Sequence, residues 1–84
     1  MVVYVYILYS ERFDRFYKGQ TRDLWSRLKR HNKGIERSTA AYRPWILVWY
    51  TIKNSRSEAL ALERKLKHMN KAKTWQFIKN HPYP

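Results

Sequence analysis

Cysteine is absent from this chain of 84 residues, and only six residues are acidic. Without cysteine the chain can form neither a disulfide nor a thiolate metal site, and this absence does not indicate a compartment. The sequence also lacks a long apolar run of the kind that spans a membrane. No signal peptide precedes the first predicted strand, so we expect a cytoplasmic protein.

The charge of the chain is strongly one-sided. Its 18 Lys and Arg residues outnumber the acidic ones and give a formal net charge of +12. Such a chain attracts polyanions, so nucleic acid is the predicted partner. Anionic membrane is the weaker alternative, because no strongly amphipathic lipid-binding face is visible. The length allows a single domain, taken as residues 1–84, and no repeat, linker or low-complexity tract divides it.

Three runs rich in β-branched and aromatic residues predict three strands. The first, residues 2–9, is apolar on both alternating faces, as expected of a central strand, and Tyr4 and Tyr6 share one of these faces. A polar turn follows, and residues 15–19 return as the second strand of a β-hairpin. Residues 45–52 form the third strand.

A helix is predicted after the hairpin. Leu24 and Leu28 mark its buried stripe, and Thr21 is the predicted N-cap. The chain turns into this helix at Gly19, and Gly34 is expected to end it in a left-handed conformation.

Two further helices complete the predicted fold. Ser55 and Glu58 have the spacing of a capping box, and the apolar stripe of the helix that they open continues to Met69. Residues 71–79 form a short last helix, whereas residues 35–44 are predicted to be a polar loop. The predicted fold class is therefore α/β, more narrowly α+β: a three-stranded, mainly antiparallel sheet flanked by helices in the order β-β-α-β-α-α.

Charged side chains beside the helical stripes allow two interpretations each. Arg27 either snorkels or pairs with Asp23, or it is held by packing and aims its guanidinium at a phosphate. Glu63 either forms an exposed ion pair with Lys67 or holds a hard divalent cation. His31 is predicted to be at the surface or half-buried, because no histidine or cysteine lies near it at zinc-ligand spacing.

The order of these pieces resembles the GIY-YIG nuclease superfamily. The similarity is greatest to its small single-domain bacterial members and to the N-terminal domain of excision-repair nucleases. It covers almost the whole chain, and although a Tyr-x-Gly triplet alone is weak, the ordered set is specific. The residues that carry it are Tyr4-Val5-Tyr6, Tyr17-Lys18-Gly19, Arg27 with His31, and Glu63.

The resemblance implies hydrolysis of a phosphodiester bond in DNA with one divalent ion, Mg²⁺ or Mn²⁺. Tyr6 would be the general base or would orient the attacking water, and Tyr17 would hydrogen-bond within the same site. Arg27 would clamp the scissile phosphate, and Glu63 would ligate the metal. Supporting roles in the site fall to Tyr4 and His31. Nucleic-acid contacts are predicted at Lys18, Lys29, Arg30, Lys33, Arg37 and Arg43.

Three positions depart from the pattern of this superfamily. Tyr4 replaces the glycine that opens the first motif, and Lys18 replaces an aliphatic residue in the second. Lys18 is expected to point away from the tyrosine before it and to contact phosphate or lie solvated at the sheet edge. Trp75 takes the place of an asparagine downstream of the metal-binding glutamate, with Asn70 and Asn80 as the nearest candidates.

Two classes of function remain open. The first is a metal-dependent endonuclease whose cutting is directed by structure or by a protein partner, because so short a chain has little surface for recognising a base sequence. Branched, flapped or single-stranded DNA would then be its substrate. The second is a non-catalytic, basic nucleic-acid-binding module that keeps the fold, in which surplus tyrosines could stack on bases. In both cases the four site residues are expected to converge on one concave, positively charged surface of the sheet.

Overall fold

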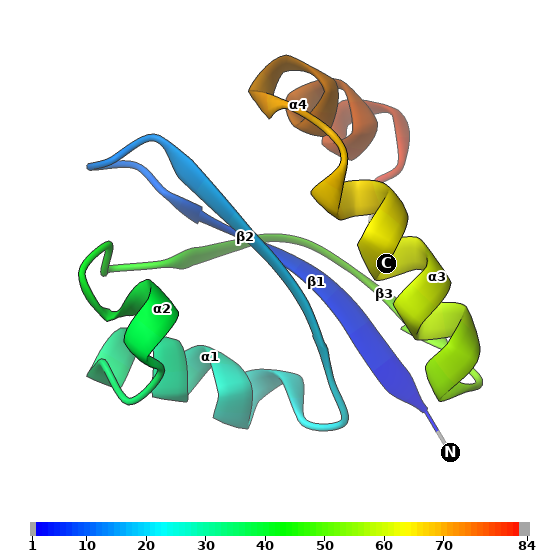
Figure 1. The fold of residues 1–84 in the computed structure, drawn as a ribbon, viewed down its shortest axis with the longest axis horizontal. Coiled ribbons are helices and arrows are strands. Elements are labelled where there is room, and N and C mark those ends of the chain that lie inside the picture. The colour runs from blue at the N-terminus through cyan, green and yellow to red at the C-terminus, as the bar shows by residue number, and fades with distance from the viewer. Residues whose placement is uncertain (1, 83–84) are drawn as a thin grey trace.

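The computed structural model describes residues 2–82, which form three strands and four helices (Figure 1). Each predicted strand coincides with an observed strand to within one or two residues. No helix in this part of the chain is long and apolar enough to cross a membrane. The elements are β1 (Val3–Ser10), β2 (Arg15–Thr21), α1 (Leu24–Lys33), α2 (Arg37–Ala40), β3 (Ile46–Lys53), α3 (Arg56–Lys67) and α4 (Lys71–Asn80).

The three strands form one antiparallel sheet in the order β2-β1-β3. β1 is central, as its two apolar faces predict, so the predicted antiparallel sheet and the fold class are confirmed. Helices α1 and α2 lie to one side of the twisted sheet, and α3 and α4 lie to the other (Figure 1).

Alternation along β1 divides the core into two clusters. Val5 and Ile7 point toward α3 and pack with Leu66, whereas Tyr6 and Leu8 point toward α1. Burying each such side chain contributes about 1.5–3 kcal/mol, so both faces of β1 stabilise the fold. Alternate residues of each strand therefore lie on opposite sides of the sheet. Even-numbered residues of β1 and odd-numbered residues of β2 lie on the side of α1.

The start of α1 differs from the prediction. The N-cap is Asp23, whose carboxylate accepts a hydrogen bond from the Ser26 amide at 3.1 Å, and not Thr21. Thr21 ends β2, and its hydroxyl accepts the Asp23 amide at 3.2 Å. Both threonine and aspartate suit an N-cap. Because β2 continues to Thr21, the helix begins later and Asp23 becomes its N-cap. Gly34 ends the helix at φ 78°, as predicted.

The segment predicted as a polar loop contains the single turn of α2. A helix of four residues is too short to show a hydrophobic period, so no pattern in the sequence indicates it. Its one buried residue is Thr39, which is held by hydrogen bonds on both sides. The predicted N-cap of α3 is confirmed, because the Ser55 hydroxyl accepts a hydrogen bond from the Glu58 amide at 3.2 Å. The Glu58 carboxylate accepts the amide of Asn54 at 3.3 Å and not that of Ser55, so the reciprocal half of the capping box is shifted by one residue.

Helix α4 packs back on the sheet as predicted. The ring of Trp75 meets Tyr9 and Phe16 edge-on, each at 4.8 Å between centroids. Asn70 caps the helix by accepting the Lys73 amide at 2.8 Å.

Candidate active site

Gly19 brings two tyrosines together. It lies directly opposite Tyr6 in the β1–β2 register, and Tyr17 lies two residues before it on the same face. A Cβ added at Gly19 would lie 2.9 Å from the Tyr6 hydroxyl oxygen and 3.0 Å from the Tyr17 ring. Any side chain here would therefore force the rings apart, which gives the glycine of the second motif a packing role.

The Tyr6 hydroxyl is one end of a buried chain of hydrogen bonds. It lies 3.1 Å from Nε2 of His31, whose Nδ1 lies 2.7 Å from the hydroxyl of Thr39. That hydroxyl donates to the Glu36 carbonyl oxygen at 3.3 Å. Because Thr39 has a single proton, its oxygen must accept the proton on Nδ1, which leaves Nε2 to accept the proton of Tyr6. The chain of donors therefore runs from Tyr6 through His31 and Thr39 to the Glu36 carbonyl.

Burial sets the protonation of this chain. His31 is 1% exposed, and burial holds its pKa below the ordinary value, so it is neutral and can accept a proton. Burial also raises the pKa of Tyr6, with Tyr17 and Glu63 adding to the effect and Arg27 opposing it. Tyr6 therefore keeps its proton, and the free phenolate is disfavoured.

His31 and Thr39 correct the prediction from sequence. His31 was expected at the surface or half-buried, but it lies at the centre of the packed face of α1. Thr39 was not identified at all, because it lies in the segment predicted as a loop. Its contact with His31 depends on the packing of α2 on α1, which no local pattern indicates.

Arg27 lies beside Tyr6. It is half-buried on α1, and its charge and a hydrogen bond both act to lower the pKa of Tyr6. Asp23, its alternative partner, uses its carboxylate to cap the helix. The structure thus favours the interpretation in which packing holds the guanidinium toward the site.

Glu63 approaches from the other side of the sheet. It is carried by α3, which packs on the face opposite to Tyr6, so the predicted single-face arrangement is wrong. The carboxylate meets the amide of Gln20 at 2.9 Å and the ammonium of Lys67 at 2.6 Å. Its charge still raises the pKa of Tyr6. Tyr6 and Glu63 therefore approach each other around the edge strand β2. The ion pair between Glu63 and Lys67, which is the simpler interpretation of this carboxylate, is also present.

The oxygen atoms of Glu63 and Gln20 are suitable ligands for a hard divalent cation. The Gln20 carbonyl oxygen is buried and has no hydrogen-bond partner among residues 2–82, and it belongs to the amide that contacts Glu63. Mg²⁺ prefers oxygen ligands and keeps several waters while using one or two carboxylates. Within the same residues no three His, Cys, Asp or Glu side chains gather to hold a metal alone. Water and substrate phosphate would have to complete the coordination, and Lys67 would have to move aside.

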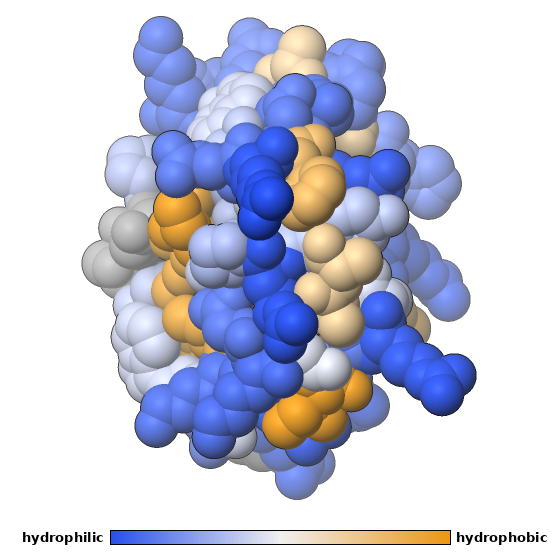
Figure 2. Space-filling model, turned by 90° about the vertical axis from the view of Figure 1, so that its left-hand side faces the viewer, coloured by the Kyte–Doolittle hydropathy of each residue, from blue (hydrophilic) through white to orange (hydrophobic). Residues whose placement is uncertain are grey.

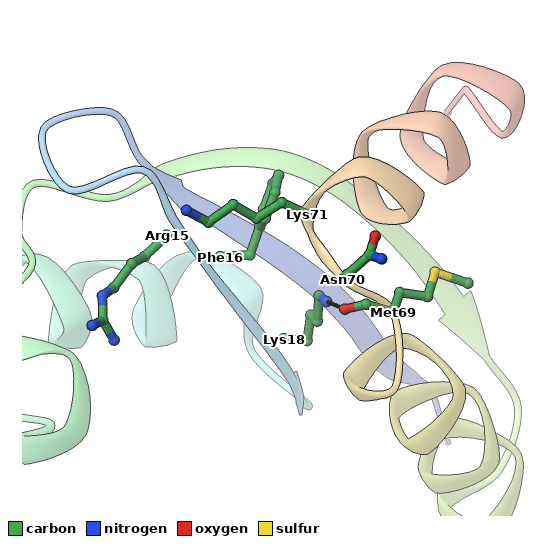
Figure 3. A pocket seen from close by; sticks show the side chains of 6 residues that line it. All are labelled: Arg15, Phe16, Lys18, Met69, Asn70 and Lys71. Carbon is green, nitrogen blue, oxygen red and sulfur yellow. Dashed lines mark hydrogen bonds between the residues drawn. The ribbon is translucent and has the colours of Figure 1, made fainter.

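Lys18 is a structural residue, which corrects its predicted contact with nucleic acid. Its ammonium donates to the carbonyl oxygens of Leu66 at 2.8 Å and Met69 at 3.2 Å and to the hydroxyl of Thr74 at 2.9 Å. All three protons are used, and burial lowers its pKa. It points away from Tyr17, as expected, and toward Met69 across a hollow of about 390 Å³ (Figure 3). The lysine in the second motif therefore joins β2 to the turn between α3 and α4.

The other predicted phosphate contacts lie on α1, on α2 and in the segment after α2. Lys29, Lys33 and Arg37 are exposed. Arg30 pairs with Glu36 at 2.9 Å. Figure 2 views this side of the molecule and shows mostly hydrophilic residues with separate hydrophobic patches. These exposed cations stay predicted contacts.

Arg43, the last of the predicted phosphate contacts, packs its guanidinium against Gly34, where it leaves no room for a Cβ. This places a cation at the carboxyl end of α1, which it stabilises.

The remaining motif positions serve packing. The ring of Tyr4 lies 6.1 Å from that of Tyr50, on the sheet face that also carries Tyr6. Trp75, at the position of the missing asparagine, contacts Tyr9 and Phe16. The side chain of Asn70 is used as a helix cap, and Asn80 lines a second hollow beside α3 and α4. Within the described residues, none of Trp75, Asn70 and Asn80 therefore joins the site.

Comparisons with known proteins agree with this fold. A family model of the GIY-YIG catalytic domain matches residues 2–76. Among solved structures, the chain is similar to a UPF0213 protein from Bacillus halodurans, determined by NMR in solution, with 32% identity and a TM-score of 0.63. The match covers 100% of this chain and 89% of that protein. No curated protein matches.

Proposed function

Because the chain belongs to the GIY-YIG family, as its resemblance predicts, we propose that it is a metal-dependent endonuclease that hydrolyses phosphodiester bonds in DNA. The observation that supports this most is the buried chain from Tyr6 to His31 and Thr39. A protein that only binds DNA needs no proton acceptor beneath a tyrosine. Arg27 on one side and Glu63 on the other supply the charges that phosphoryl chemistry requires.

Tyr6 and His31 handle the proton of the attacking water. Because the pKa of Tyr6 is raised, it does not wait as a phenolate. Instead its oxygen takes a proton from water while its own proton passes to Nε2 of His31. The water oxygen bonds to phosphorus, the bond to the leaving oxygen breaks, and solvent protonates that oxygen. His31 then returns its proton to Tyr6 as Tyr6 releases one to solvent, which restores the site, and burial favours this return because it disfavours imidazolium.

Arg27 and Tyr17 position the phosphate. A guanidinium held by packing on a helix offers a planar fork of donors that matches two phosphate oxygens. Tyr17 packs against His31 with 4.8 Å between ring centroids, which keeps the imidazole in place and leaves the tyrosine hydroxyl for the substrate.

Glu63 and Gln20 would hold Mg²⁺ or Mn²⁺ through oxygen. The ion, when bound, polarises the phosphoryl oxygen and stabilises charge on the leaving oxygen. Before it binds, Glu63 is neutralised by Lys67. This pair keeps an otherwise uncompensated carboxylate from repelling DNA.

Nicking of supercoiled plasmid with Mg²⁺, Mn²⁺ or EDTA tests the proposal. Wild-type protein should nick only with a divalent ion, and Glu63→Gln should abolish nicking while DNA binding persists, because the amide lacks the charge that holds the ion. Glu58→Gln is the matched control, since it removes a negative charge from the same helix but keeps a residue that suits the capping box. Absence of metal-dependent nicking in wild type would favour the non-catalytic binding module. Nicking that survives Glu63→Gln unchanged would place the metal elsewhere.

A further inference from the structure

Four side chains form a cluster at the tip of the β1–β2 hairpin, which we call the hairpin-tip cluster: Arg12, Phe13, Arg15 and Tyr42. The rings of Phe13 and Tyr42 meet edge-on at 5.4 Å between centroids. The Arg15 guanidinium lies over the Tyr42 ring at 4.3 Å, and that of Arg12 lies 5.7 Å from the Phe13 ring. Phe13 remains 43% exposed, so part of its ring is free to contact a ligand.

The tip is fixed from both sides of the sheet. Asp14 adopts a positive φ of 53° in the turn, and its carboxylate accepts the Tyr9 hydroxyl at 2.8 Å and the Lys71 ammonium at 3.0 Å. On the opposite side Phe13 rests on Tyr42. A turn held at two points presents its aromatic ring in one place, so a ligand that stacks on Phe13 does not have to order the loop first.

The cluster is continuous with the candidate active site. Arg15, Tyr17 and Gly19 occupy alternate positions of β2 and so share the sheet face of Tyr6. From Gly19 to Arg15 the strand spans about 14 Å, with the Tyr17 ring between them. Two acidic residues lie near this tip. Asp14 forms an ion pair with Lys71, whereas Glu11 forms none among the described residues.

We propose that the hairpin-tip cluster binds unpaired nucleotides of the strand whose phosphodiester lies at Tyr6. The preferred substrate is then DNA with a single-stranded arm beside the cut. An exposed ring stacks on any unpaired base, whereas bases within a duplex offer no free face, and the flanking arginines contact the phosphates. A second copy of this chain is a poor occupant, because each copy carries a formal charge of +12. The position of the arm relative to the cut rests on the proposed function, but the binding does not.

Binding without metal tests the cluster separately from cleavage. The probes are a labelled blunt duplex and the same duplex with an oligothymidine arm of about six nucleotides, measured by fluorescence anisotropy in EDTA. Wild type should bind the armed duplex more tightly. Phe13→Leu should weaken binding of the armed duplex by about five-fold or more and leave the blunt duplex unchanged, since one base stack is lost. Phe13→Trp should keep the preference, because it keeps a ring.

Trp25→Leu is the matched control. Trp25 is 63% exposed on α1, and its replacement removes a ring outside the cluster, so the preference for the arm should persist. Thermal unfolding of each variant checks the fold. If Phe13→Leu proves unstable, Arg12→Gln replaces it, and it should reduce the salt dependence of armed binding by about one charge. Equal affinity of wild type for the two probes, or an equal loss with Trp25→Leu, would overturn the proposal. Since no cleavage occurs in EDTA, either result leaves the proposed nuclease function to its own test.

Discussion

At the level of single side chains, the hydroxyl of Thr39 decides which nitrogen of His31 carries the proton. With Nδ1–H fixed by Thr39, Nε2 faces Tyr6 as an acceptor. The hydroxyl of Thr39 contacts His31 and the Glu36 carbonyl oxygen, so it acts on the site through His31. Its effect should therefore fall on the chemical step and not on binding.

Thr39→Val keeps the shape of the side chain and removes the hydroxyl. We expect the rate of cleavage to fall about ten- to hundred-fold with DNA affinity unchanged, as is typical when the group that orients a catalytic imidazole is lost. Nitrogen NMR of His31 should show a mixture of tautomers. Thr39→Ser should restore both the rate and the tautomer. A normal rate in Thr39→Val, or a loss that Ser does not restore, would contradict this role.

The lowered pKa of His31 makes stability depend on pH. Tyr6, Arg27, Arg30 and Glu36 surround or influence this imidazole, and burial dominates. In the unfolded chain histidine binds a proton near its ordinary pKa of 6.5, whereas the folded state resists it. The contribution of His31 to the free energy of unfolding is therefore complete above pH 6.5. It is lost as the pH falls through the lower pKa that His31 has in the folded state. Between about pH 7.5 and 5.5 the melting temperature of wild type should fall more steeply than that of His31→Gln. Parallel curves would show that His31 titrates normally.

At the level of elements, Lys18 connects β2 to the turn between α3 and α4. It satisfies the Leu66 carbonyl at the end of α3 and the Thr74 hydroxyl in α4. Since α3 carries Glu63, this connection also fixes the carboxylate that we propose as a metal ligand relative to β2.

Lys18→Met should lower the free energy of unfolding by about 1–3 kcal/mol, because buried oxygens lose their donor. For a domain of this size that is a fall in melting temperature of at least about 4 °C. The salt dependence of DNA binding should not change. Lys29→Met, on the exposed side of α1, should do the reverse: it should leave the melting temperature nearly unchanged and make the salt slope shallower by about one. If Lys18→Met melted at the wild-type temperature but bound DNA with a shallower salt slope, Lys18 would contact phosphate, as the sequence predicts.

The sequence indicates some elements of this fold and site much better than others. The apolar faces of residues 2–9 predict a central strand because alternation depends only on neighbours, and the N-cap at Ser55 is equally local. Tyr6, Tyr17, Arg27 and Glu63 can be proposed from sequence because the order and spacing of the motifs resemble those of the family. The helix at Thr39 and the contact between Gln20 and Glu63 cannot, because each joins segments whose pairing is set by the tertiary fold.

At the level of the whole molecule, the candidate site wraps around one edge of the sheet. Tyr6 and Arg27 belong to the side covered by α1, and Glu63 belongs to the side covered by α3. Gly19 and Gln20, adjacent in β2, face these two sides and touch both halves. A substrate strand would therefore cross β2 at this point, with the exposed cations of α1 and α2 beside it.

Binding to DNA should be strongly dependent on salt and indifferent to base sequence. If about four phosphates are neutralised by the exposed cations, log affinity should fall with log salt at a slope of roughly −3.6. Titrations of two unrelated sequences at several salt concentrations measure both properties. A flat salt dependence, or a marked preference for one sequence, would contradict binding through phosphates.

Tyr6→Phe tests whether Tyr6 passes the proton of the attacking water to His31, because it removes only the hydroxyl that would join the substrate to His31. Single-turnover cleavage of one DNA substrate with Mn²⁺ should slow by at least about a hundred-fold, the usual contribution of a positioned proton acceptor. Affinity for that DNA in EDTA should stay at the wild-type value. Tyr4→Phe is the matched control on the same face of the sheet and should cleave normally. Cleavage by Tyr6→Phe at the wild-type rate would show that Tyr6 does not take the proton of the attacking water.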